Sequence, residues 1–199
     1  MEVTMTQGWD GLAKEWELNP TTERFAKSAF TQLQNLIPLD GIKVLDFGCG
    51  TGQLSRLLSP SVKDIVALDS SEAMIEELDK KELANVEPIV DELTRGLVAQ
   101  HPAFRTQFDL VIASSVLPFV NDRTTVLEIS QSLLSDNGYF VHFDWLSDSA
   151  NEGFTLDDSK RALINAGFRH VEVNKVFDLS ADNGSYSVIM GIGRPLTMS

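Results

Sequence analysis

The stretch VLDFGCGTGQL, residues 44–54, decides the fold of this chain. A short apolar run leads to Asp46, then to glycines at positions 48, 50 and 52, and then to a helix-like pattern. Glycines at this spacing permit a sharp turn and let a ligand approach the backbone, because no Cβ lies in the way. Where a strand passes into a helix, such a turn also presents free N–H groups beyond the sheet edge. The carboxylate before the first glycine disfavours a phosphate and favours a ligand with positive or hydrogen-bond-donating groups.

The composition of the chain excludes several classes of function. Its 199 residues suit one domain with a sizeable core, and 43% hydrophobic with 23% charged residues is typical of a soluble globular protein. A formal net charge of −13 disfavours a nucleic-acid partner and gives no support for an anionic membrane surface. No apolar run approaches the length of a membrane span, and residues 1–10 lack a signal-peptide pattern.

The single cysteine, Cys49, excludes an intrachain disulfide and fits a reducing, cytoplasmic compartment. It lies between glycines, far in sequence from any cysteine or histidine, so we expect no metal site there. A small residue that fits a tight turn explains Cys49 better than a reactive thiol does.

Strands and helices alternate along the rest of the chain. The sequence predicts strands at 43–47, 64–68, 86–90, 108–113 and 139–145, followed by an antiparallel pair at 170–179 and 186–193. Helices are expected at 9–16, 20–37, 53–58, 72–81, 122–134 and 155–166. Region 92–107 is left open as helix or loop, broken near Gly96 and Pro102, and Asn137-Gly138 indicates a turn. This alternation indicates a doubly wound α/β sheet with helices on both faces.

The polar residues that could bind a ligand fall where the predicted strands end. Asp69 ends the second strand and could accept hydrogen bonds from both hydroxyls of a ribose, although a helix N-cap is an alternative role. Asp91 ends the third strand, Ser114 and Ser115 end the fourth, and the fifth ends with His142, Asp144 and Trp145. In a sheet of this kind, ligands bind beyond these carboxyl ends, at the switch in strand order.

Two classes of nucleotide-like ligand compete for this site. Dinucleotide sites use the pattern G-x-G-x-x-G, whereas this chain has G-x-G-x-G with Gln53 in the place of the third glycine. Asp46 would also lie unfavourably beside a pyrophosphate. The spacing therefore disfavours a nucleotide-dependent oxidoreductase.

Four segments resemble class I S-adenosylmethionine-dependent methyltransferases, of the small-molecule type. Residues 44–54 are similar to the first motif of that family, and ALDSSEAMIE (67–76) is similar to its ribose-binding motif. FDLVIASSVLPFV (108–120) and LLSDNGYFVHFDW (133–145) resemble its fourth- and fifth-strand motifs. The resemblance covers residues 20–193. It implies a Rossmann-like three-layer α/β/α sandwich, with a seven-stranded, mostly parallel sheet and an antiparallel C-terminal strand.

The resemblance also implies the cofactor S-adenosyl-L-methionine, with S-adenosyl-L-homocysteine as product. It places Asp69 on the ribose hydroxyls, Asp91 near the adenine amino group and Ser114 near the methionyl group. Because this cofactor carries a sulfonium and an ammonium but no phosphate, surrounding acids are favourable. The full set of expected cofactor contacts is Asp46, Gly48, Cys49, Gly50, Gly52, Asp69, Ser70, Met74, Asp91, Glu92 and Ser114.

The methyl acceptor is expected to be a small molecule. Family members that methylate amino groups of nucleic-acid bases carry Asp/Asn-Pro-Pro-aromatic after the fourth strand, and this chain has Ser114-Ser115-Val116-Leu117-Pro118-Phe119 there. That run is closer to the Leu-His-His type of small-molecule enzymes, with Pro118 and Phe119 in place of both histidines. A protein or tRNA methyltransferase and a non-catalytic cofactor-binding module remain as alternatives.

Two side-chain groups are candidates for handling the acceptor. His142 and Asp144 alternate on one strand, so they share a face and could act as a base and its partner, or be a core histidine and a capping acid. Residues 1–18 are expected to form a separate helical segment, a possible lid, ahead of the main domain at 19–199. The lid alternative has Trp9 and Trp16 shaping the acceptor pocket together with Phe119 and Trp145, whereas the other alternative is plain packing on the domain.

Overall fold

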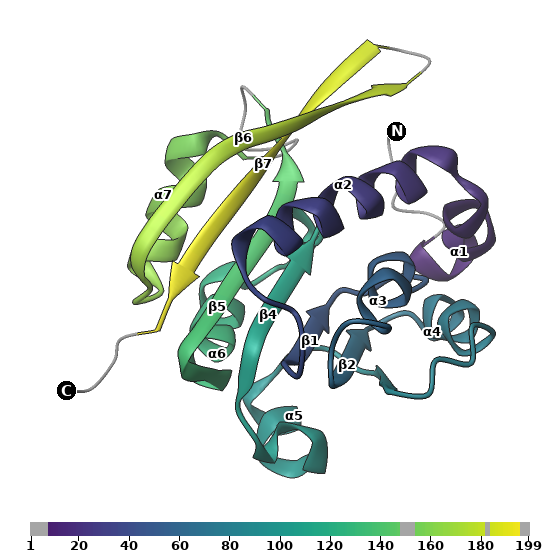
Figure 1. Cartoon of the computed structure of the whole chain (residues 1–199), viewed down its shortest axis with the longest axis horizontal. Helices are drawn as coiled ribbons and strands as arrows, with labels where there is room; N and C mark the ends of the chain where they lie inside the picture. The colour runs from purple at the N-terminus through teal and green to yellow at the C-terminus, as the bar shows by residue number, and fades with distance from the viewer. Residues whose placement is uncertain (1–7, 148–153, 182–183, 196–199) are drawn as a thin grey trace.

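A central β-sheet organises the computed structural model, which describes residues 8–147, 154–181 and 184–195 (Figure 1). Within these residues the sheet has seven strands in the order β3-β2-β1-β4-β5-β7-β6. Strand β7 runs antiparallel to both neighbours, and the other pairings are parallel. The predicted seven-stranded, mostly parallel sheet with an antiparallel C-terminal strand is therefore confirmed. The strands are β1 (Lys43–Phe47), β2 (Asp64–Asp69), β3 (Val86–Val90), β4 (Phe108–Ser114), β5 (Leu134–Trp145), β6 (Arg169–Ala181) and β7 (Gly184–Arg194).

Helices cover both faces of the sheet and produce the expected three layers (Figure 1). On β1 and β4, Val44 and Leu110 are buried on one face while Leu45 and Val111 are buried on the other, so two apolar cores form. The first core is covered by α2 (Pro20–Leu36), α3 (Gln53–Leu58) and α4 (Glu72–Asp79). The second is covered by α6 (Arg123–Leu133) and α7 (Leu156–Asn165), with α5 (Arg95–Gln100) and the 3-10 turn η1 (Pro102–Arg105) at its border.

The strand order creates the place where a ligand can bind. The chain builds β1, β2 and β3 outward in one direction and then returns to place β4 on the other side of β1. Phe47 pairs with Ala113, so the carboxyl ends of β1 and β4 lie side by side at the switch in strand order. Open sheets of this type leave a crevice at that point.

The structure differs from the sequence prediction at two connections. Asn137-Gly138 is not a separate turn but lies inside β5, where the pairing with β4 shifts between Phe108 and Leu110. The strand absorbs the extra residues as a bulge or irregularity in its pairing with β4. In region 92–107, Gly96 lies inside α5 rather than breaking it, while Pro102 begins η1.

The N-terminal helix α1 (Gly8–Leu18) is followed directly by α2, with Asn19 between them. Asn19 caps α2, because its Oδ1 accepts a hydrogen bond from the Thr21 N–H at 2.9 Å, and Pro20 occupies the first turn. None of the helices in the described residues has the length and apolar character needed to cross a membrane.

Candidate active site

A cavity of about 1730 Å³ opens at the carboxyl ends of β1, β2, β4 and β5. Pockets for a single small ligand usually occupy about 300–1,000 Å³. The cavity is therefore large enough for two small ligands, as a group-transfer reaction requires.

The glycine turn after β1 forms one wall of this cavity. Gly48 and Gly50 adopt φ angles of 68° and 55°, which side chains disfavour. The N–H groups of Gly48 and Cys49 both donate to the Leu68 carbonyl, at 2.8 and 3.1 Å, and hold the turn against β2. A Cβ on Gly48 would lie 2.3 Å from Val116 Cγ2, so the turn and the segment after β4 approach too closely for any side chain.

Gly52 has different surroundings from Gly48 and Gly50. It does not line the cavity, and a Cβ there would lie 2.3 Å from Leu78 Cδ1 of α4. Its φ of 77° also begins α3 in a left-handed conformation. The close approach of Leu78 and the left-handed backbone are sufficient reasons for a glycine at this position.

Asp46 is a buried carboxylate with one unused oxygen. It is 1% exposed, lines the cavity, and accepts a hydrogen bond from Ser55 Oγ through Oδ2 at 2.6 Å. Its Oδ1 has no hydrogen-bond partner among the described residues. Burial raises the pKa of Asp46 to about 6, the Ser55 hydrogen bond opposes this, and the charge of Asp69 adds to it. A buried carboxylate oxygen that lacks a hydrogen-bond partner suits a ligand that is cationic or donates an N–H group.

Asp69 joins the glycine turn to the next strand. Its Oδ2 accepts a hydrogen bond from the Gly50 N–H at 2.8 Å, and its Oδ1 accepts one from the Ser71 N–H at 2.9 Å. Burial raises its pKa. The N-cap of α4 is Ser71, whose Oγ accepts from the Met74 N–H at 3.2 Å. Asp69 therefore does not cap α4, and its carboxylate lines the cavity with acceptor capacity left.

The other predicted cofactor contacts also line the cavity: Cys49, Ser70, Met74, Asp91, Glu92 and Ser114. The Asp91 N–H donates to the Asp69 carbonyl at 3.0 Å, which ties the third strand end to the second. Burial raises the pKa of the Cys49 thiol well above its usual value, so this cysteine stays a thiol rather than a reactive thiolate.

Thr51 and Ser115 also line the cavity, and both lie outside the set of expected cofactor contacts. Thr51 is 1% exposed, lines the cavity, and has a hydroxyl without a partner in the described residues. Ser115 lines the cavity with a φ of 58°, a strained conformation for a side-chain-bearing residue. Thr51 could have been proposed from its place inside the glycine motif, whereas sequence carries no signal for the conformation of Ser115.

Aromatic side chains form the remaining walls. All four residues expected to bind the acceptor, Trp9, Trp16, Phe119 and Trp145, line the cavity. Trp9 packs edge-to-face on Phe119 and on Trp16, with ring centroids 5.0 and 5.9 Å apart. Such a wall excludes water and offers flat apolar surface to a ligand.

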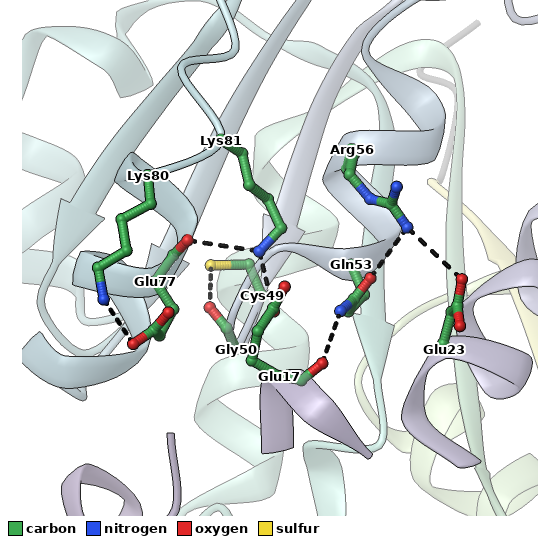
Figure 2. A network of polar contacts seen from close by, with 9 residues as sticks. All are labelled: Glu17, Glu23, Cys49, Gly50, Gln53, Arg56, Glu77, Lys80 and Lys81. Carbon is green, nitrogen blue, oxygen red and sulfur yellow. Dashed lines mark hydrogen bonds and ion pairs between the residues drawn. The ribbon is translucent and has the colours of Figure 1, made fainter. Parts of the chain in front are cut away.

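Helix α1 is held over the glycine turn by polar contacts at both ends. Near its start, Asp10 Oδ1 accepts a hydrogen bond from Ser71 Oγ at 2.5 Å. Near its end, Glu17 pairs with Lys81 at 2.9 Å, and the Glu17 carbonyl accepts from Gln53 Nε2 at 3.3 Å (Figure 2). Figure 2 shows the contacts of Glu17 grouped around Cys49 and Gly50. The helix thus binds to the same segments that form the cavity wall.

His142 and Asp144 form a buried pair apart from the cavity. Neither lines it, and their side chains are 1% and 0% exposed. His142 Nδ1 lies 2.7 Å from Asp144 Oδ2, and its Nε2 lies 2.7 Å from Ser159 Oγ of α7. Burial raises the pKa of Asp144, opposed by the hydrogen bond from His142. Both ring nitrogens are engaged inside the protein, so this geometry favours the alternative of a hydrogen-bonded core histidine over that of an acceptor base.

Together, the fold and the site define a class: a Rossmann-like α/β protein whose glycine turn and strand-end acids suit a nucleoside-containing ligand. Within that class, the chain belongs to the methyltransferase domain family, whose family model matches residues 21–189. The family predicted from the four motifs is therefore confirmed.

Solved methyltransferase structures share this fold. A putative methyltransferase solved in a complex with the Haloferax volcanii Trm112 methyltransferase activator superposes with a TM-score of 0.78 at 16% identity, covering 96% of this chain and 100% of that one. The N-methyltransferase NodS from Bradyrhizobium japonicum, solved with S-adenosyl-L-homocysteine, superposes with a TM-score of 0.71 at 18% identity, covering 94% and 98%.

The curated sequence relatives are longer than this chain. The ubiquinone biosynthesis O-methyltransferase of Azorhizobium caulinodans is 26% identical over 143 residues, which cover 68% of this chain and 56% of the relative. Overall the chain spans about half the length of the curated relatives that it matches.

Proposed function

We propose that the chain is an S-adenosylmethionine-dependent methyltransferase that acts on a small molecule. The observation that carries this proposal is Asp46, a buried carboxylate beside the glycine turn whose Oδ1 has no partner in the part of the chain that the structure describes. A cationic amino group would satisfy that oxygen, whereas a phosphate would be repelled. The family membership and the relatives that methylate small molecules support the same function.

The described residues fit this cofactor. Asp46 would receive the ammonium group, Asp69 the ribose hydroxyls, and Asp91 with Glu92 the adenine end. When bound, S-adenosylmethionine supplies an electrophilic methyl group on a sulfonium. The protein then has to orient the acceptor and exclude water, and orientation alone can lower a barrier by up to about 7–11 kcal/mol.

We further propose that α1, at the end of segment 1–18, closes the site over the main domain at 19–199. Trp16 supports this role, because its Nε1 would lie 3.6 Å from a Cβ on Gly50. The contacts of Asp10 and Glu17 with α3 and α4 hold the helix in that position. The lone buried cysteine, Cys49, fits action in a reducing compartment such as the cytoplasm.

Calorimetry followed by a methyl-transfer screen tests the proposed function. We expect the full chain to bind S-adenosylmethionine and S-adenosylhomocysteine but not NAD. Incubation with S-adenosylmethionine labelled in its methyl group should then label a small molecule from a metabolite extract. Binding of NAD alone would contradict the cofactor assignment, and cofactor binding without any labelled product would leave a binding module.

The pKa of Asp46 predicts how cofactor affinity depends on pH. A cationic ligand binds the carboxylate form, and the free protein holds a proton on Asp46 below pH about 6. Affinity for S-adenosylhomocysteine should thus be constant above pH 7 and about tenfold weaker at pH 5. The stability of the free protein should depend on pH in the opposite direction, because the folded state binds the proton on Asp46 more tightly than the unfolded chain does. Its free energy of unfolding should therefore fall as the pH rises from about 4 to 6.

Titration calorimetry at pH 5, 6, 7 and 8 measures this dependence, with Asp46→Asn as the comparison. The asparagine variant should bind weakly with a flatter pH profile. A wild-type affinity that does not change between pH 5 and pH 8 would refute ammonium recognition by Asp46.

Because His142 and Asp144 form a buried pair apart from the cavity, we expect Ser159→Ala to lower the stability of the protein and to leave methyl transfer unchanged. Removing the hydroxyl leaves His142 Nε2 without its partner, which costs about 1–3 kcal/mol of unfolding free energy. Urea unfolding measures the loss, and Ser132→Ala on the exposed surface of α6 serves as a control that changes little. If Ser159→Ala instead keeps its stability and loses methyl transfer, the pair acts in catalysis.

A further inference from the structure

The cavity has a second half, away from the glycine turn, that the cofactor contacts leave free. It is formed by the start of α2, the end of β5 and the strand ends of the β6–β7 pair. Strands β5, β7 and β6 lie on the other side of β1 from β2 and β3, whose carboxyl ends carry Asp69 and Asp91, and this half contains an arginine. Its lining residues include Thr21, Thr22, Arg24, Phe25, Trp145 and Tyr186.

The side walls of this half are aromatic. Phe25 and Trp145 lie with ring centroids 5.2 Å apart, and Trp145 and Tyr186 lie edge-to-face at 6.1 Å. Tyr186 is 46% exposed and Trp145 is partly buried, so part of this aromatic surface is open to a ligand. Rings of this kind pack well against a flat apolar group.

Arg24 is an exposed residue that lines the cavity together with these aromatic residues, and its side chain is held in position by hydrogen bonds. Its Nε donates to the Pro20 carbonyl at 3.3 Å, and its Nη2 donates to Thr21 Oγ1 at 3.2 Å and to the Ser180 carbonyl at 3.0 Å. These bonds join the first turn of α2 to β6 and fix the plane of the guanidinium. They leave the two N–H groups of Nη1 for another acceptor.

The charge of Arg24 is not neutralised within the described residues. No carboxylate lies within ion-pair distance of it there, whereas Arg95 pairs with Glu128 at 2.8 Å and Lys27 pairs with Glu23 at 2.7 Å. Among the described residues, Arg24 and Arg95 are the arginines that line the cavity, and of the two Arg24 is the one without a carboxylate partner. The N-terminus of α2, a helix of 17 residues, adds a partial positive charge on the same side.

We propose that the methyl acceptor is a flat, largely apolar molecule with an anionic group, a carboxylate or a phosphate, which Arg24 binds. This inference rests on the proposed function, since it assigns the acceptor half of the same cavity. The two halves then divide the charges: acids near the glycine turn receive the cationic cofactor, and Arg24 receives the anionic acceptor. The aromatic walls hold the apolar part between them.

Binding of matched aromatic probes tests the acceptor class. The full chain is saturated with S-adenosylhomocysteine and titrated with 2-naphthoate, 2-naphthyl phosphate or the neutral 2-naphthamide, with calorimetry as the readout. We expect at least one anion to bind about tenfold tighter than the amide, in line with one charge-assisted hydrogen-bonded contact. The stronger of the two anions identifies the group.

Variants of two residues on α2 test whether Arg24 causes the preference for the anionic probe. Arg24→Gln should abolish the preference for the anion, and Arg24→Lys should retain part of it, because the charge remains but the fork is lost. Lys27→Gln is the matched control, since it removes the same charge one turn later at a residue that does not line the cavity. Affinity for S-adenosylhomocysteine and the melting temperature of each variant show that it is folded.

Several outcomes would overturn the inference: equal binding of anion and amide by the wild type, failure of both anions to bind, or equal losses in Arg24→Gln and Lys27→Gln. Each leaves the proposed function standing provided that S-adenosylhomocysteine binds. Loss of cofactor binding in the wild type contradicts the proposed function instead.

Discussion

Replacing Asp69 with alanine is expected to weaken the binding of S-adenosylhomocysteine by about 100-fold or more, because two hydrogen bonds to a charged group are each worth about 1.5–3 kcal/mol. In the free protein this carboxylate also accepts hydrogen bonds from the Gly50 and Ser71 N–H groups. Alanine removes both acceptors and loosens the glycine turn at the same time. The loss should thus exceed what the ribose contacts alone would produce.

Calorimetry on matched variants of β2 measures this effect. Asp64→Ala is the control, because Asp64 begins the same strand, is exposed and lies outside the cavity. Asp69→Asn should also bind weakly, since its amide N–H₂ group would face one of the two backbone donors. Cofactor affinity within about threefold of the wild type in Asp69→Ala, a difference of only ~0.6 kcal/mol, would contradict the assignment of Asp69 to the ribose.

Replacing Gly191 with alanine is expected to destabilise the protein by about 3 kcal/mol or more, the range of severe overpacking combined with a lost buried hydrogen bond. Gly191 of β7 pairs with His142 of β5, and a Cβ there would lie 2.1 Å from His142 Nε2. The imidazole would have to move, which breaks its contact with Ser159 and displaces its bond to Asp144. Urea unfolding and the yield of folded protein measure the result.

A double-mutant cycle identifies the clash as the cause. His142→Ala removes the ring, so Gly191→Ala should cost much less in that background, and the two changes should be strongly non-additive. Gly96→Ala in α5 is the control, because the nearest atom to its added Cβ is Thr94 Oγ1 at 3.7 Å and alanine favours a helix. A Gly191→Ala variant as stable as the wild type would show that the packing around His142 is not as described.

The sequence predicted most of the fold because its signals are local. Strands β1 and β3 match their expected ranges, because a strand pattern can be read from neighbouring residues alone. The prediction of a turn at Asn137-Gly138 was wrong, because the same pair of residues occurs in turns and in bulges. Only the pairing of β5 with β4 distinguishes the two.

The roles of single site residues were harder to predict, because they depend on distant neighbours. Gly52 resembles Gly48 and Gly50 in the motif, yet it lies against Leu78 of α4 instead of facing the cavity. His142 and Asp144 share a strand face as expected, but α7 covers that face and supplies Ser159 as the third member.

The sequence by itself determined the alternation of strands and helices, the glycine turn, the acids at the strand ends and hence the family. These features repeat a spacing along the backbone and need no knowledge of what lies opposite. Only the tertiary structure decided that, within the described residues, Asp46 keeps an oxygen without a partner, His142 lies outside the cavity, and Arg24 lines the cavity without a carboxylate partner. Burial and charge pairing are properties of side chains brought together from distant segments, so no local pattern records them.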